Sequence, residues 1–132
     1  MEVIEHLIAS LDQAVSNKDI ESIREIYATD ACLVKQPGEL ARGIDEITAH
    51  YEALFALNIP LTITTEIVKS ISVRSMVLVT SSWLMEGVDP EGNKGSVKKI
   101  ANMVFVAADG DGWQLLVDNP FGPELLQIDN VQ

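Results

Sequence analysis

One carboxylate in the chain stands where it could act as a general acid or base. Asp118 lies in the last segment with strand-like alternation, in which Leu116 points to the same face. A carboxylate buried among apolar side chains has a raised pKa, because burial disfavours its charged form. Asp118 is therefore our candidate acid or base. The alternative is a structural carboxylate that accepts backbone hydrogen bonds or bonds to Asn102.

Two other polar side chains could assist such chemistry. A turn centred on Gly110 would place Asn102 directly opposite Asp118, on the preceding strand. The Asn102 amide could polarise a carbonyl group, or it could only satisfy a neighbouring polar group. Trp83, one strand further back, could present its indole N–H to a ligand, or it could pack in the core.

The hydrophobic pattern predicts the elements that position these residues. Apolar residues at helical spacing predict three helices, at about 3–16, 19–27 and 44–57. A short strand at 31–34 and a Pro37-Gly38 turn separate the second helix from the third, and two short strands are expected there. Four longer segments alternate with a period of two, at about 61–71, 76–86, 96–107 and 113–119. The order predicts an α+β domain whose curved, mostly antiparallel sheet and helices enclose a cone-shaped cavity.

Three local motifs strengthen this prediction. They are Asp19-Ile20-Glu21 followed by 26–31, Ala41-Arg42-Gly43 leading into 44–47, and Gly110–Gln114 followed by Val117–Pro120. In their order and spacing they resemble the nuclear-transport-factor-2-like superfamily, with its SnoaL-like and bacterial ketosteroid-isomerase-like members. The resemblance implies a cystatin-like cone with the sheet wrapped around three N-terminal helices. It also implies a single SnoaL-like domain over 1–132, with a core at about 3–119 and a tail at 120–132.

The resemblance also tests one specific activity. Ketosteroid isomerases use a tyrosine on the first helix, a carboxylate base on the first strand and a protonated acid on a central strand. The matching positions here hold Leu11, then Lys35 or Gln36, and Asn102. All three roles are altered, so we do not expect ketosteroid isomerase activity.

A ligand pocket is the common feature of the functions that remain. The resemblance assigns to the cavity the candidate catalytic residues Asp118 and Asn102 and the candidate ligand-binding residues Trp83, Val79, Ser81, Ile100 and Leu116. Such a mostly apolar pocket with few polar groups is typical of small-molecule sites. We expect a lyase or isomerase acting on an apolar carbonyl-type ligand through Asp118. The alternatives are a non-catalytic protein that binds an apolar ligand, and an association module.

Composition limits the partners. The chain has 20 Asp and Glu against 9 Lys and Arg, a net charge of -11, which argues against binding nucleic acid or an anionic membrane surface. The expected partners are a small apolar molecule and a second copy, joined through an outer sheet face that carries Val73, Met76, Leu78 and Leu84. His6 and His50 lack metal-ligand spacing, so we expect no metal and no cofactor. A single cysteine, an acidic N-terminus and no long apolar run predict a cytoplasmic protein.

Overall fold

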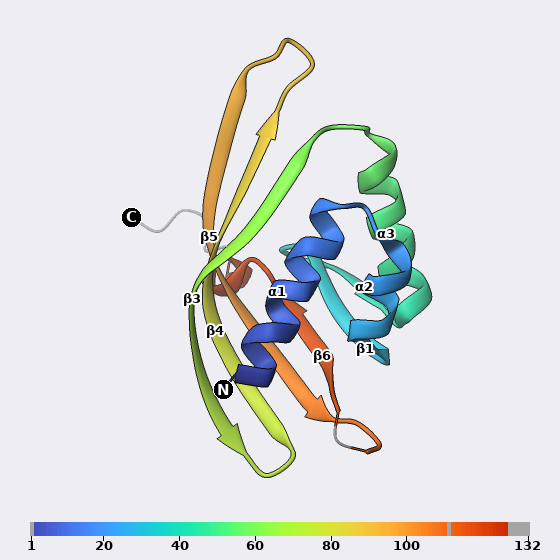
Figure 1. Ribbon diagram of the computed structural model, residues 1–132, viewed down its shortest axis with the longest axis vertical. Coiled ribbons are helices and arrows are strands. Elements are labelled where there is room, and N and C mark those ends of the chain that lie inside the picture. Colours follow the sequence, from blue (N-terminus) through green and yellow to red (C-terminus); the bar gives the residue numbers. More distant parts are fainter. Residues whose placement is uncertain (1, 111, 127–132) are drawn as a thin grey trace.

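The computed structural model describes residues 2–110 and 112–126 of the chain. Its elements follow the expected order of two helices, two strands, a helix and four longer strands (Figure 1). They are α1 (Glu2–Ser16), α2 (Ile20–Ile26), β1 (Tyr27–Gln36), β2 (Glu39–Arg42), α3 (Ile44–Ala56), β3 (Leu61–Val73), β4 (Met76–Val88), β5 (Lys94–Ala107), β6 (Trp113–Asn119) and the short 3-10 helix η1 (Gly122–Leu126). The predicted α+β class is confirmed.

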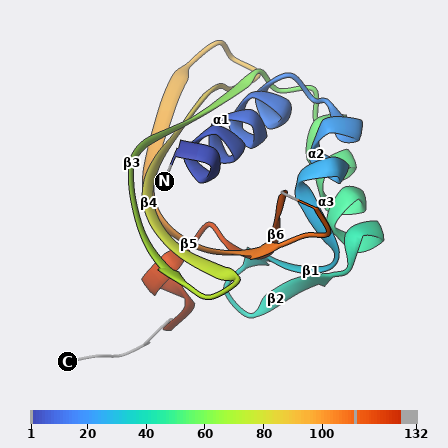
Figure 2. The same ribbon diagram turned by 60° about the horizontal axis from the view of Figure 1, so that its bottom comes forward.

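The six strands form one sheet in the order β2-β1-β6-β5-β4-β3. Neighbouring strands are antiparallel except for β1 and β6, which run parallel. The sheet curves strongly, and α1 lies inside the arc while α2 and α3 close its side (Figure 2). The sheet therefore has a concave face toward the helices and a convex face turned away from them.

The core lies between α1 and the concave face. Ile4, Ile8, Leu11 and Val15 recur every three or four residues along α1 and are all buried. They belong to one apolar cluster with residues of the central strands, namely Val77, Val79, Phe105 and Leu115. Each fully buried side chain of this size contributes roughly 1.5–3 kcal/mol. This burial fixes which side of each strand faces the helices.

Two polar side chains of α1 occupy the edge of β3. The Ile63 N–H donates to Ser16 Oγ at 2.9 Å, and the Thr65 N–H donates to Asp12 Oδ2 at 2.8 Å. Four residues of helix advance about 6 Å and two residues of strand about 6.6 Å, so the two pairs match in spacing. Asp12 and Ser16 thus satisfy amides that an edge strand would otherwise leave unpaired.

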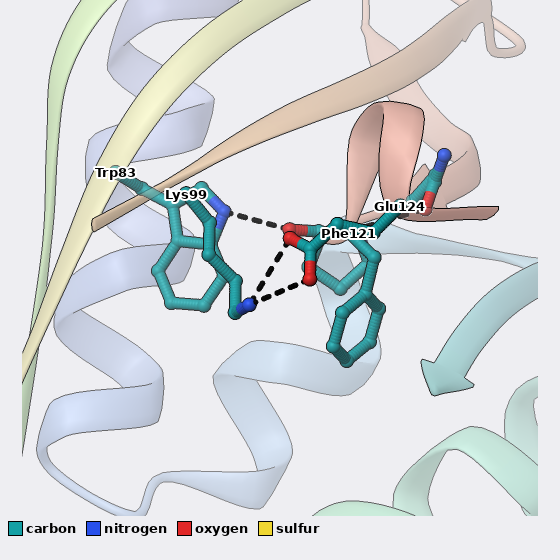
Figure 3. Close-up of polar contacts among 6 residues, drawn as sticks. Trp83, Lys99, Phe121 and Glu124 are labelled. Atoms are coloured by element: carbon teal, nitrogen blue, oxygen red, sulfur yellow. Dashed lines mark hydrogen bonds and ion pairs between the residues drawn. The ribbon is translucent and has the colours of Figure 1, made fainter. Parts of the chain in front are cut away.

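The segment after β6 packs against β4 and β5. The Trp83 indole N–H donates to the Pro120 carbonyl at 2.9 Å (Figure 3). Lys99 Nζ lies 2.9 Å from a Glu124 carboxylate oxygen and 5.5 Å from the centre of the Phe121 ring. These contacts hold residues 120–126 of the expected tail on the sheet, and residues 127–132 lie outside the described residues.

Candidate functional site

Asp118 lies in the middle of the sheet. It is on β6 and pairs with Leu33 of β1 on one side and with Met103 of β5 on the other. Its side chain is only 6% exposed. The strand alternation that buries Leu33 and Met103 therefore also directs a carboxylate into the interior.

One tyrosine bonds directly to this carboxylate, and a second tyrosine bonds to the first. The Tyr27 hydroxyl donates to Asp118 Oδ2 at 2.5 Å, and the Tyr51 hydroxyl oxygen lies 2.9 Å from that of Tyr27. Tyr27 is the first residue of β1, directly after α2, and Tyr51 is on α3. A hydroxyl has one hydrogen. Because Tyr27 donates its hydrogen to Asp118, it accepts a hydrogen bond from the Tyr51 hydroxyl. We call this series the Asp118–Tyr27–Tyr51 chain.

Burial sets the electrostatics of the Asp118–Tyr27–Tyr51 chain. It raises the pKa of Asp118 to about 6, although the hydrogen bond from Tyr27 acts in the opposite direction. The negative charge of Asp12 raises that pKa further. Burial and the nearby Asp118 charge also raise the pKa of both Tyr27 and Tyr51 above the usual range. Both tyrosines therefore stay protonated donors while Asp118 titrates near neutral pH.

A second partly buried carboxylate lines a hollow between α1 and β3. Burial raises the pKa of Asp12, and its hydrogen bonds with Thr65 partly oppose this. The hollow has a volume of about 220 Å³. This α1–β3 hollow is lined by Glu5, Ile8, Ala9, Asp12, Thr65, Glu66 and Val68.

Several residues that the sequence predicts for the pocket lie on the concave side. Val79 and Ser81 are buried, and Leu116 is partly buried against the core. Trp83 also packs on the core cluster, but its N–H is occupied by the Pro120 carbonyl. Trp83 therefore follows the packing alternative, and its N–H is not offered to a ligand.

The predicted pairing of Asn102 with Asp118 is wrong. The turn is where the sequence placed it, since Phe105 pairs with Leu115, but the register then shifts between Val104 and Phe105. Beyond this bulge Met103, not Asn102, is opposite Asp118. A one-residue shift moves every later side chain to the other face of the sheet.

Asn102 and Ile100 consequently lie on the convex face, away from Asp118. Asn102 Oδ1 accepts a hydrogen bond from Thr80 Oγ1 at 3.0 Å in an exposed position. Ile100 is 43% exposed. Ala101 and Met103, their neighbours along β5, are buried on the concave face instead.

A comparison with models of protein families agrees with the fold and the motifs described above. Residues 7–114 match the model of the SnoaL-like domain. The chain belongs to the SnoaL-like family. No curated protein matches it.

Solved structures share the fold of this SnoaL-like domain at low identity. A cystatin-like protein from Caulobacter vibrioides is 18% identical with a TM-score of 0.73, covering 97% of this chain and 94% of its own. A nuclear transport factor 2-like superfamily protein from Salmonella enterica serovar Typhimurium is 11% identical with a TM-score of 0.77, covering 88% and 85%. A Catenulispora acidiphila protein, in complex with S-DNPA, is 13% identical with a TM-score of 0.78, covering 89% and 88%.

The sequence did not single out the partners of Asp118. Tyr27 and Tyr51 fall inside the predicted helices 19–27 and 44–57, and the pattern predicts no polar role for either. A buried tyrosine hydroxyl needs a hydrogen-bond partner, so two tyrosines on buried faces were the available signal. Asp12 carried a weaker signal, because it follows the buried Leu11 at the border of the apolar stripe.

A metal-ion cluster and a membrane-spanning helix are both absent from the described residues. In that part of the chain, no three His, Cys, Asp or Glu side chains gather in a way that could hold a metal ion. No helix within residues 2–110 and 112–126 has the length and apolar character that crossing a bilayer requires. The expected cytoplasmic location stays a prediction.

Proposed function

We propose that this SnoaL-like protein binds a small apolar carbonyl compound and uses Asp118 as a general acid and base, in a lyase or isomerase type of reaction. The observation that carries the proposal is the Asp118–Tyr27–Tyr51 chain, a buried carboxylate that accepts from one protonated phenol, which in turn is bonded to a second. A catalytic group works best when its pKa is close to the working pH. The value of about 6 for Asp118 meets that condition.

The first step follows from the charge of Asp118. At neutral pH most of the Asp118 population is ionised and can take a proton from the carbon next to the ligand's carbonyl. The C–H bonding pair then becomes the enolate, and Asp118 becomes a neutral acid. Returning the proton to another carbon isomerises the ligand. Loss of a leaving group with its electron pair from the adjacent carbon completes an elimination instead.

The tyrosines can respond to this proton transfer. Once Asp118 is neutral, its new O–H can donate to the Tyr27 oxygen. Tyr27 can then donate to Tyr51, and the Tyr51 hydrogen becomes available to the enolate oxygen. A donor that is released only after proton transfer stabilises the charge that develops in the reaction more than it stabilises the free ligand.

The proposal does not extend to ketosteroid isomerase chemistry. Leu11 is buried in the core, and Lys35 pairs with Glu39 at 2.8 Å. Asn102 is on the convex face, bonded to Thr80. None of these positions supplies the donor or base that such an isomerase needs.

Deuterium exchange tests the proposal without knowledge of the natural substrate. The protein is incubated with cyclohexanone, 2-cyclohexenone and acetophenone in D2O, and loss of the α-proton signals is followed by NMR. We expect exchange that rises with pH through an inflection near 6 and is lost in Asp118→Asn. Asp89→Asn, at an exposed turn, is the matched control.

Each outcome of the exchange experiment has a definite meaning. Exchange that persists unchanged in Asp118→Asn would contradict the catalytic role of this residue. Ketones that bind without any exchange in the wild type would favour the alternative, a non-catalytic binding protein. The S-DNPA complex of the Catenulispora acidiphila relative is compatible with either reading.

The convex face favours a second function, association with another copy of the chain. Ile71 pairs with Leu78, and Val73 pairs with Met76, and all four side chains are 45% exposed or more. We propose a homodimer through this face, because a monomer leaves a contiguous apolar surface in water. Light scattering of the wild type and of Leu78→Asp tests it. A wild type that stays monomeric at high concentration contradicts the dimer.

A further inference from the structure

A buried hydroxyl group lies next to the α1–β3 hollow. Ser81 is 2% exposed, and within the described residues its Oγ has no hydrogen-bond partner. Val68, which lines the hollow, pairs directly with Ser81 across β3 and β4 and shares its face. Buried polar groups are almost always paired in proteins. A group from outside the chain would complete the hydrogen bonding of Ser81.

One small side chain, Ala101, and then Met103 separate Ser81 from Asp118 on the concave face. Ala101 is opposite Ser81 on β5, and the next concave residue of β5 is Met103. Met103 is directly opposite Asp118. The row Val68, Ser81, Ala101 therefore runs from the hollow at the sheet edge inward, and Met103 is the side chain a ligand must displace to reach Asp118.

We propose that the α1–β3 hollow is the entrance for the ligand, that Ser81 binds an oxygen or nitrogen of it, and that the ligand is neutral or cationic rather than anionic. This inference rests on the proposed function in so far as it leads the ligand to Asp118. Its claims about the place of entry and the ligand charge stand on the hollow and Ser81 alone.

The lining of the hollow decides the ligand charge. Glu5, Asp12 and Glu66 contribute three carboxylates, and Glu66 is paired with Lys98 at 3.0 Å. The described lining holds no Lys or Arg, and the adjacent Lys98 is already paired with Glu66, so an anionic ligand would meet like charges there as it loses its hydration. Ile8 and Val68 offer apolar contact, so an apolar body with one hydrogen-bonding group fits the lining.

Three probes of similar shape and different charge test the proposal. Benzyl alcohol, benzylamine and benzoate are titrated into the isotope-labelled full chain, and backbone amide shifts are followed by NMR. We expect the first two to shift the amides of Thr65, Val68 and Ser81, and benzoate to bind at least tenfold more weakly. Benzoate binding as tightly as benzyl alcohol, or no shift at these amides with any probe, overturns the proposal.

Two variants of α1 locate the entrance. Ala9 is exposed and lines the hollow, whereas Gln13 is exposed on the same helix but outside the lining. We expect Ala9→Trp to fill the hollow and reduce benzyl alcohol affinity at least tenfold, and Gln13→Trp to leave it unchanged. Equal affinity in both variants overturns the entrance.

Ser81→Ala separates hydrogen bonding from shape. We expect benzyl alcohol to bind severalfold more weakly, while the melting temperature stays equal or rises because an unpaired buried hydroxyl is gone. Unchanged affinity in Ser81→Ala overturns the role of this hydroxyl.

Asp118→Asn keeps this inference distinct from the proposed function. Probe binding that survives in Asp118→Asn while deuterium exchange is lost supports both. If the wild type binds the probes at Thr65 and Val68 but exchange is unaffected in Asp118→Asn, the entrance stands and the proposed function fails. If exchange depends on Asp118 but is unchanged in Ala9→Trp, the proposed function stands and the entrance fails.

Discussion

The two faces of one sheet differ sharply in this protein, although the same strands build both. On β4, Val77 and Val79 are fully buried on the concave face, while Leu78 between them is 45% exposed on the convex face. The concave face places a carboxylate among buried apolar residues, where its charge is unfavourable. The convex face leaves apolar side chains in water. Each face therefore holds groups in an unfavourable environment, and the proposed ligand and the proposed dimer would each relieve one of them.

The largest difference between the two faces is expected when two neighbouring residues of β4 are each replaced by Asp. Val79→Asp puts an unpaired charge in the core and should destabilise the fold by more than about 4 kcal/mol. Leu78→Asp changes an exposed residue, so the fold should be retained while the proposed dimer is lost. Circular dichroism melts and light scattering measure the two effects. Two folded variants, or two unfolded ones, would show that the faces do not differ in this way.

The pH dependence of stability should report the buried charge on the concave face. Because the pKa of Asp118 rises from 3.8 to about 6 on folding, its contribution to stability is full below pH 4 and is lost as the pH rises through 6. The loss is roughly 3 kcal/mol, from about two pKa units.

Urea unfolding of wild type and Asp118→Asn at pH 4 and pH 7 measures this effect. The variant has no carboxyl group at this position and should not lose this roughly 3 kcal/mol as the pH rises. Its free energy of unfolding relative to the wild type should therefore increase from pH 4 to pH 7. A parallel pH dependence in both proteins would contradict a raised pKa at Asp118.

Removing the Tyr27 and Tyr51 hydroxyls one at a time should show how much each contributes to stability on the concave face. Tyr27→Phe takes away the direct donor to Asp118, so stability at pH 7 should fall by about 2 kcal/mol and the pKa of Asp118 should rise. Tyr51→Phe leaves that bond in place and should cost about 1 kcal/mol. The inflection of the exchange profile measures the pKa shift. An inflection that moves more in Tyr51→Phe than in Tyr27→Phe would mean that Tyr51, not Tyr27, is the direct donor to Asp118.

The smallest effect is expected on the convex face. Asn102→Ala removes an exposed hydrogen bond with Thr80, so stability should change by no more than about 0.5 kcal/mol. Deuterium exchange should be unaffected, because the amide lies on the other side of the sheet from Asp118. A large loss of exchange in this variant would return Asn102 to the site.

The elements could be predicted because each depends on neighbours in the chain. Helical spacing in α1 and the alternation in β3 to β6 are local patterns, and the turn near Gly110 was also placed correctly. Asp118 was found in the same way, as a polar residue in an apolar strand. Asn102 was misplaced because a bulge inserts one residue into the pairing of β5 with β6, and nothing in the local pattern marks it.

The partners of Asp118 depended on contacts between distant parts of the chain. Tyr27 of β1 reaches it across 91 residues of sequence, and Tyr51 of α3 bonds to Tyr27 across 24. By itself, the sequence determined the α+β order, the net charge and the presence of one acid on an apolar strand. Only the tertiary structure decided that Tyr27, backed by Tyr51, bonds to that acid and that Asn102 does not. The reason is that side-chain direction follows from local alternation, whereas register and packing depend on the whole sheet.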